Sequence, residues 1–311
     1  MKYLAILFHC ILFCTTAVAQ PYEEFTLDSE VKTFLDKNFS DLKSWDLGVK
    51  LRNSDNQLYL DSIEYSPWHV ADFNDDGLLD LFVQMYKRKE NRALLIMALE
   101  EVGTYNLLEV EPVKKVGDLH IPFIEETQEG PLIIYKQYAT EQTSRTKDGV
   151  EIKSPKNFNT YYSLGFLKKD TLIYRFDRLM EYASKPNLSG FRYVQLRSYC
   201  QFGGCPDYIL KVDSVGNMIL QNIKNTALDP GYYKAVCDPD LFRNLQLRVK
   251  YLQLPKTEMK FGDNTADKVI TMIIAFSDGR TYKVLDYTTE GTLGLKGLYD
   301  YMEEIRTTTL W

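Results

Sequence analysis

The chain has 311 residues, of which 45% are hydrophobic and 26% charged, as is ordinary for a globular protein of about two domains. Its formal net charge of −6 argues against a nucleic-acid-binding protein, because such a protein needs a basic face. Aromatic residues make up 13% of the chain, including 22 tyrosines, and this favours β structure.

Residues 1–19 have the pattern of a secretory signal peptide. A lysine at position 2 precedes a short apolar segment, Leu4–Phe13, and Ala17-Val18-Ala19 matches a cleavage site. We therefore expect an exported protein, periplasmic or secreted, that is cleaved near Ala19. A lipoprotein is not expected, because Phe13 stands before Cys14 where a bacterial lipobox has a small residue. No later stretch is long and apolar enough to predict a membrane span.

The first half of the chain predicts one helix followed by strands. Apolar residues recur at helical spacing after Asp28, a suitable N-cap, and predict an amphipathic helix over 28–44. The range 92–99 is apolar enough to be a strand buried on both faces, and the charged residues 87–91 before it predict a hairpin tip. Further strands are expected over 58–65, 79–86, 107–113, 131–138, 160–167 and 171–176.

The second half predicts an antiparallel sheet covered by helices. The segment 183–190 is rich in Pro, Gly, Ser and Asn, so we interpret it as a linker between a β-rich domain, 20–183, and a smaller domain, 191–306. Helices are expected after Asp238-Pro239 and after Gly294. Strands are expected over 191–198, 208–213, 218–223, 269–276 and 281–287. This order of elements predicts the α+β fold class, with the helices on one side of the sheet.

The stretch Asp72–Asp80 has the pattern of a loop that binds a hard cation. Oxygen ligands are offered at loop positions 1, 3, 5, 7 and 9 by Asp72, Asn74, Asp76, the Leu78 carbonyl and Asp80. Ca²⁺ takes six to eight such oxygens, and Gly77 at position 6 permits the sharp turn. An EF-hand is excluded because Val83 occupies position 12 and a strand-like sequence follows. The alternative interpretation is an Asx-rich β-turn that binds no metal.

The run of residues 70–83, with its flanking apolar positions, resembles the calcium loops of integrin-type FG-GAP repeats. The resemblance implies a loop within a β-hairpin. In that family the unit recurs as the blades of a propeller, and the single copy here argues against a propeller. We expect a structural Ca²⁺ ion, since no catalytic group accompanies the loop in the sequence.

A second dense stretch lies between Cys200 and Cys205. Cysteines of an exported chain meet an oxidising compartment, so Cys200, Cys205 and Cys237 are disulfide candidates. Two glycines between Cys200 and Cys205 let the backbone fold tightly, and we prefer a bridge between these two. The alternatives are a bridge to Cys237, free thiols, a redox pair, or a zinc site completed by His69 or His120.

The stretch 197–208 resembles the signature of an uncharacterised bacterial exported-protein domain family, R-S-x-C-F-G-x-C-P-x-Y. The resemblance covers about 191–306 and includes a Gly-rich hairpin and a C-terminal S-D-G hairpin followed by a helix. Gln201-Phe202 departs from the signature and lengthens the spacing between the cysteines. The family has no established activity, so the resemblance implies a fold and no mechanism.

No nucleotide-binding, nucleophile-elbow or zinc-protease motif is present. The leading interpretation is therefore an exported, non-enzymatic binding or structural protein with a calcium-stabilised loop. Its candidate partners are a cell-surface glycan or another protein. The alternative is a carbohydrate-active or other hydrolase using Asp/Glu side chains. The pairs Glu100-Glu101 and Glu125-Glu126 are poor candidates, because adjacent strand residues face opposite ways. A cleft holding two carboxylates beside Tyr or Trp would favour the hydrolase.

Overall fold

The computed structural model describes residues 22, 25–50, 60–61, 65–88, 90–101, 103–110, 120–137, 168–224, 226–254, 259–262, 267–287, 289 and 291–311. The predicted signal peptide and the predicted strand 160–167 lie outside these residues. By its contacts the chain divides into two compact units, Met1–Lys50 with Ser66–Glu109, and Leu51–Tyr65 with Val110–Trp311. Across the described ranges, no helix has both the length and the apolar character needed to cross a membrane.

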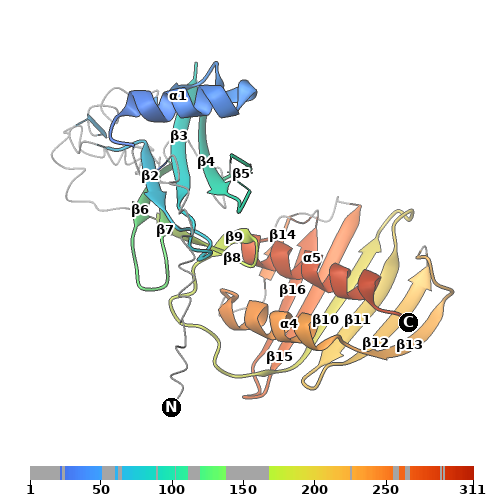
Figure 1. Ribbon diagram of the computed structural model, residues 1–311. Coiled ribbons are helices and arrows are strands. Elements are labelled where there is room, and N and C mark those ends of the chain that lie inside the picture. The colour runs from blue at the N-terminus through green and yellow to red at the C-terminus, as the bar shows by residue number, and fades with distance from the viewer. Residues whose placement is uncertain are drawn as a thin grey trace, which may run out of the picture. The chain divides into compact units, whose positions relative to one another are not determined.

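The first unit is an antiparallel sheet with a helix on one face (Figure 1). Strand β3 pairs with β4 along one edge and with β2 and β1 along the other, and β5 follows β4. The helix is α1 (Asp28–Asn38), followed by the 3₁₀ helix η2 (Ser40–Leu42). The strands are β1 (Asp46–Leu47), β2 (Trp68–Ala71), β3 (Asp80–Lys87), β4 (Glu90–Ala98) and β5 (Tyr105–Glu109).

Apolar residues at helical spacing hold α1 on this sheet. Val31, Phe34 and Leu35 are buried against inward-facing residues of β3 and β4. The helix ends before the predicted residue 44, because Phe39 is extended and its ring packs against Phe34 and Tyr105. The prediction for 92–99 is confirmed, since all residues from Ala93 to Ala98 of β4 are buried.

The second unit contains a small antiparallel sheet in the order β6-β7-β8-β9. Its strands are β6 (His120–Glu125), β7 (Leu132–Gln137), β8 (Lys168–Arg175) and β9 (Arg178–Glu181). In the predicted strand 58–65, Leu60 and Asp61 are helical, so that prediction is wrong there. Tyr65, at the end of the same range, donates a hydrogen bond of 2.8 Å to the Pro122 carbonyl of β6.

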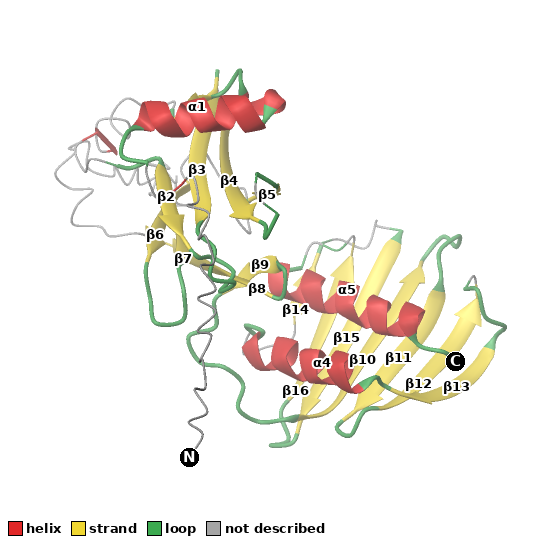
Figure 2. Ribbon diagram, in the orientation of Figure 1, coloured by secondary structure: helices red, strands yellow, loops and turns green. Residues whose placement is uncertain are grey.

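The second unit also contains a seven-stranded sheet, in the order β13-β12-β11-β10-β15-β16-β14. All its pairings are antiparallel except that between β14 and β16. Helices α4 and α5 lie along one face of this sheet (Figures 1 and 2). The elements are β10 (Phe191–Cys200), β11 (Asp207–Asp213), β12 (Asn217–Lys224), β13 (Gly231–Val236), α4 (Pro239–Tyr251), β14 (Met259–Phe261), β15 (Lys268–Phe276), β16 (Thr281–Tyr287) and α5 (Leu293–Thr308). The α+β fold class is confirmed.

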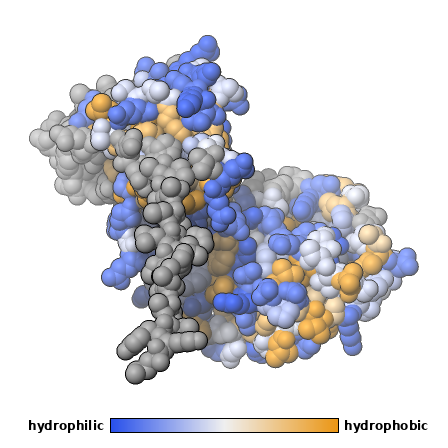
Figure 3. All heavy atoms as spheres, in the orientation of Figure 1, coloured by the Kyte–Doolittle hydropathy of each residue, from blue (hydrophilic) through white to orange (hydrophobic). Residues whose placement is uncertain are grey.

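Helix α4 begins where the sequence predicts, and α5 begins at Leu293, two residues earlier than the start predicted after Gly294. Asp238 caps α4 by accepting hydrogen bonds from Asp240 N at 2.9 Å and Leu241 N at 3.2 Å, and Pro239 is the first helical residue. Leu245 and Val249 of α4 pack with the apolar stripe of α5 into one core. Alternate residues of the central strands complete this core, so the sheet has one face buried by helices. Figure 3 shows hydrophilic and hydrophobic residues intermixed over the outer surface on this side.

The hairpin of β8 and β9 is attached to α5. Both carboxylate oxygens of Glu181 accept hydrogen bonds from the start of α5, from Leu293 N at 2.7 Å and Gly294 N at 2.8 Å. These are amide groups that a helix itself leaves without partners, so the carboxylate satisfies them and favours the helix dipole. A Cβ atom at Gly297 would come within 2.6 Å of Arg178 Cδ, so a larger residue there would require the Arg178 side chain to move.

Residues 183–190, predicted as a linker, connect β9 to β10 and are tied to the seven-stranded part. The Asn187 side chain donates to the carbonyls of Val249 and Leu252, and Ser189 Oγ donates to Asp278 at 2.7 Å. The two compact units are defined by contacts, and the second includes both small and large sheets. The predicted division into 20–183 and 191–306 is therefore not tested by them and stays a prediction.

Candidate functional site: an acidic hairpin loop and a disulfide turn

The acidic stretch closes a β-hairpin. Strands β2 and β3 pair antiparallel, with Ala71 opposite Asp80, and residues 72–79 form the loop between them. Asp75 and Gly77 have φ angles of 60° and 83°, which place both in the left-handed region. Glycine adopts this region at no steric cost, and Asp tolerates it better than most side chains.

Side-chain oxygens inside the loop converge on a few backbone amides. Asp76 N donates to both Asp72 Oδ1 and Asn74 Oδ1, at 3.2 Å each, so these two oxygens lie close together. The second oxygen of Asp72 accepts from Gly77 N at 2.8 Å, and Asp76 Oδ1 accepts from Leu78 N at 2.8 Å. The loop is thus an Asx-rich turn whose first, third and fifth residues gather their oxygens on one side of the backbone.

Asp80 has a different environment from the other loop carboxylates. It is fully buried, and it accepts hydrogen bonds from Phe73 N at 2.9 Å and Ala98 N at 3.0 Å. Burial raises the pKa of its carboxyl to about 7; the two amide bonds oppose this rise, and the charges of Asp76 and Asp72 add to it. Asp80 therefore fastens the loop to β4 while resisting ionisation.

The loop carries negative charge that no described basic side chain neutralises. None of Asp72, Asp75, Asp76 and Asp80 forms an ion pair with a Lys or Arg of the described ranges. A hard cation fits the oxygens of Asp72, Asn74 and Asp76, with the Leu78 carbonyl next in the chain. Asp80 is fully buried, whereas Asp72 is half-buried and Asp76 exposed, so direct contact of Asp80 with an ion is a poorer fit. In the part of the chain that the structure describes, no three His, Cys, Asp or Glu side chains form a ready-made metal-binding group.

The disulfide prediction is confirmed. Cys200 and Cys205 are bridged, with their Cα atoms 5.6 Å apart, across the turn between β10 and β11. Gly203 and Gly204 have φ angles of 84° and 95°, which explains why the turn needs both glycines. Cys237 is free and buried, and burial raises the pKa of its thiol to about 11. The alternatives of a bridge to Cys237 and of a zinc site are therefore wrong.

The turn is also fastened from the side. Gln201 N donates to the Asp267 carbonyl at 2.8 Å, and Phe202 N donates to Asp267 Oδ1 at 3.2 Å. Phe202 itself is 77% exposed, so it contributes no core packing. Asp267, directly before β15, thus holds the backbone of the turn at two consecutive residues.

The remaining candidates from the sequence do not gather into a site. Glu100 and Glu101 are exposed in the turn between β4 and β5, and Glu125 and Glu126 are exposed at the end of β6. His69 is half-buried on β2, opposite Phe82 of β3. His120 begins β6, and its side chain lies outside the described residues.

Two carboxylates do share a cavity, although at positions that sequence reasoning missed. Asp300 and Glu303 of α5 line a cavity of about 430 Å³ together with Tyr208 and Tyr299. Two carboxylates beside tyrosines are the arrangement that would favour a hydrolase, but Glu303 does not have the raised pKa that a catalytic acid needs. Burial would raise its pKa, yet hydrogen bonds from Arg306 and Tyr208 lower the pKa below the usual value. A carboxyl held ionised in this way does not suit a general acid, which needs a raised pKa.

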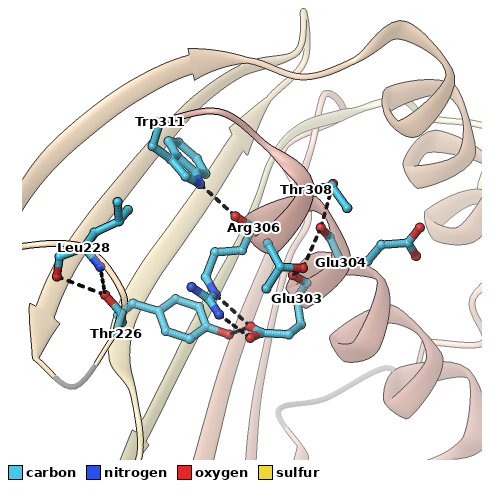
Figure 4. Close-up of polar contacts among 9 residues, drawn as sticks. Thr226, Leu228, Glu303, Glu304, Arg306, Thr308 and Trp311 are labelled. Carbon is cyan, nitrogen blue, oxygen red and sulfur yellow. Dashed lines mark hydrogen bonds and ion pairs between the residues drawn. The ribbon is translucent and has the colours of Figure 1, made fainter.

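Figure 4 shows this end of α5. The Arg306 guanidinium makes two hydrogen bonds to the Glu303 carboxylate, at 2.5 and 3.0 Å, and Trp311 Nε1 donates to the Arg306 carbonyl at 2.7 Å. The sequence did contain a pattern that could have revealed the two carboxylates that line the cavity. Polar residues recur at helical spacing next to the apolar stripe of the last helix. Lys296, Tyr299, Asp300 and Glu303 recur at i, i+3, i+4 and i+7, which places them on one helix face.

Comparison with known proteins finds a family match for the second half of the chain. Residues 193–306 match a domain of unknown function, DUF6438. This segment includes the disulfide turn and most of the seven-stranded sheet with its two helices, and it leaves out the acidic loop. No curated protein matches the chain.

Proposed function

We propose that this chain is an exported, non-enzymatic binding or structural protein whose first unit is stabilised by a Ca²⁺ ion at the loop 72–80. The observation that carries the proposal is the uncompensated charge of four aspartates within nine residues, beside converging side-chain oxygens. Such a loop repels itself when all its carboxylates are ionised, and a cation removes the repulsion.

In this proposal Asp72, Asn74 and Asp76 hold the ion with their side chains, and Leu78 offers its carbonyl. Asp80 stays on its two amide partners and contributes charge beneath the loop. When bound, the ion supplies positive charge that favours the ionised form of these carboxylates. Its role is structural, since the loop joins two strands of one sheet and fixes their register.

Two observations support export. The pattern of residues 1–19 is that of a signal peptide. The bridge between Cys200 and Cys205 is of a kind that forms and persists in oxidising compartments and is rare in the cytosol. An exported protein of this kind meets cell-surface glycans and other exported proteins, and these two classes are its candidate partners.

The calcium proposal is tested by thermal unfolding of the full chain, followed with increasing Ca²⁺ and in chelator. We expect Ca²⁺ to raise the melting temperature. At a Ca²⁺ concentration a hundredfold above Kd, the free energy of unfolding should increase by about 2.7 kcal/mol. Asp76→Ala should lower the melting temperature and remove the increment that Ca²⁺ gives.

A matched control is available one residue earlier in the loop. Asp75→Asn also removes one negative charge, and asparagine tolerates the positive φ of this position. It should retain the Ca²⁺-dependent increment, because Asp75 occupies the fourth loop position and offers no ligand in this proposal. Equal melting of the unmodified protein in Ca²⁺ and in chelator would refute the calcium site.

A further inference from the structure

The cavity beside α5 arises from a small residue in the middle of the seven-stranded sheet. Ser198 of β10 lies directly opposite Tyr208 of β11 on one side and Ile270 of β15 on the other. Directly paired residues of antiparallel strands share a face, so these three side chains form a row beneath α5. Serine is much smaller than its two neighbours, and the space above it is part of the cavity of about 430 Å³. The next row, Leu210–Leu196–Met272, is filled by large residues.

The inner wall of the cavity is apolar and aromatic, and two hydroxyl-bearing residues also line the cavity. Leu196, Ile270, Tyr208 and Tyr299 are buried and form the inner wall. Ser198 is only 6% exposed, and it is one of the residues that line the cavity. A buried hydroxyl that faces a cavity is stabilised by a ligand or water that bonds to it. Thr289 adds a second hydroxyl to the lining.

The charges around the cavity do not cancel. Asp300 is paired with Arg178 at 3.1 Å, and Glu303 is paired with Arg306 at 2.5 Å. Lys268 of β15 and Lys296 of α5 also line the cavity, and neither forms an ion pair within the described ranges. Each carboxylate therefore has its own arginine at ion-pair distance. The two lysines add further positive charge at the rim, where the charge of Lys268 also acts on Glu303.

We propose that this cavity binds a small organic anion, with its carboxylate, sulfonate or phosphate group between Lys268 and Lys296 and its apolar body against the inner wall. The volume lies within the range of small-molecule sites, and such sites combine an apolar lining with a few polar groups. The Ser198 hydroxyl, in the row beneath the cavity, offers a hydrogen bond to the part of the ligand that lies over it. This proposal does not depend on the calcium loop.

A pair of fluorescent probes tests both parts of this chemistry on the full chain. 8-Anilinonaphthalene-1-sulfonate and N-phenyl-1-naphthylamine share an apolar body and differ in the sulfonate. We expect saturable binding of the sulfonate at one site, about tenfold tighter than that of the neutral compound, since one charge-assisted hydrogen bond is worth at least this factor. Equal affinity for the two probes would overturn the proposal.

Two variants and a control locate the binding. Lys268→Met with Lys296→Met keeps the length of both side chains and removes their charge, and it should weaken sulfonate binding about tenfold without affecting the neutral probe. Lys234→Met, at the exposed edge strand β13, removes the same kind of charge from outside the cavity and should leave both affinities unchanged. Unchanged sulfonate binding in the double variant would contradict the site.

A filling variant gives a second, independent measurement. Ser198→Leu places a large side chain in the centre of the row and should reduce the binding of both probes at least about tenfold. Where this variant does not fold, the rim variants decide the matter, because Lys268 is exposed and Lys296 half-buried at the mouth. Full probe binding by a folded Ser198→Leu protein would place the site elsewhere.

Discussion

Two turns of this protein each connect a pair of antiparallel strands, and they are held closed by different kinds of bond. The acidic loop joins β2 to β3, and the disulfide turn joins β10 to β11. Both depend on glycines with positive φ, at Gly77 in the first and at Gly203 and Gly204 in the second. The first is closed by carboxylates that accept backbone hydrogen bonds, and the second by a covalent bond.

The difference decides which conditions act on each turn. A loop closed by carboxylates responds to pH and cations, because protonation and ion binding change its charge. A turn closed by a disulfide responds to the redox state and is unaffected by calcium. The comparison predicts that each turn can be weakened without affecting the other. Three measurements of the free energy of unfolding test this, from the largest expected change to the smallest.

The largest effect is expected from Asp80→Ala. This change leaves the amides of Phe73 and Ala98 without their acceptor in a buried place, and each unsatisfied buried donor costs about 1–3 kcal/mol. We expect a loss of about 3 kcal/mol in the free energy of unfolding, measured by urea denaturation at pH 5. Asp75→Asn, exposed in the same loop, should stay within about 0.5 kcal/mol of the unmodified protein. A loss under about 1 kcal/mol for Asp80→Ala would show that these amides find other partners.

Opening the disulfide is expected to have the next largest effect. The bridge closes a short loop, so replacing both Cys200 and Cys205 by serine should cost about 2 kcal/mol through the entropy of the unfolded chain. The measurement is urea denaturation of the variant beside the unmodified protein, oxidised and reduced. The comparison predicts that the response to Ca²⁺ is the same in both proteins. A variant that loses its calcium response would mean that the two turns are coupled.

The smallest effect is the pH dependence due to Asp80. Its pKa is about 7 in the folded protein against 3.8 in the unfolded chain, so between these values only the folded state holds the proton. The contribution of this group to stability is therefore greatest below pH 3.8, falls as the pH rises, and is constant above about 7. We expect a fall on the order of 1 kcal/mol, after allowance for relaxation of the buried site.

The appropriate measurement is the difference in unfolding free energy between the unmodified protein and Asp80→Asn, taken in chelator from pH 4 to pH 8. Other carboxylates contribute to both proteins alike, so the difference isolates Asp80. Ca²⁺ should flatten the difference, because the ion favours the ionised carboxylate. A difference that increases with pH would contradict the assignment of a raised pKa.

Local patterns predicted many of the elements. The Asp238-Pro239 start of α4, the buried strand β4, the hairpin before β16 and the bridge between Cys200 and Cys205 all follow from neighbouring residues. The strands that were missed are short or edge strands whose residues do not alternate clearly: β1, β2, β6, β9, β13 and β14. Half of β13 is exposed, so its apolar residues give no burial signal. Only pairing with β12 makes it a strand.

The sequence by itself determined the α+β class, the strand that follows the acidic loop and the disulfide, because turn chemistry and helix caps act over a few residues. The tertiary structure decided which distant residues lie next to the functional side chains. It buried Asp80 under β4, placed Glu181 at the start of α5, and gathered Ser198, Lys268 and Lys296 from separate elements around one cavity. These arrangements depend on strand register and helix packing over long separations, and no local pattern encodes them.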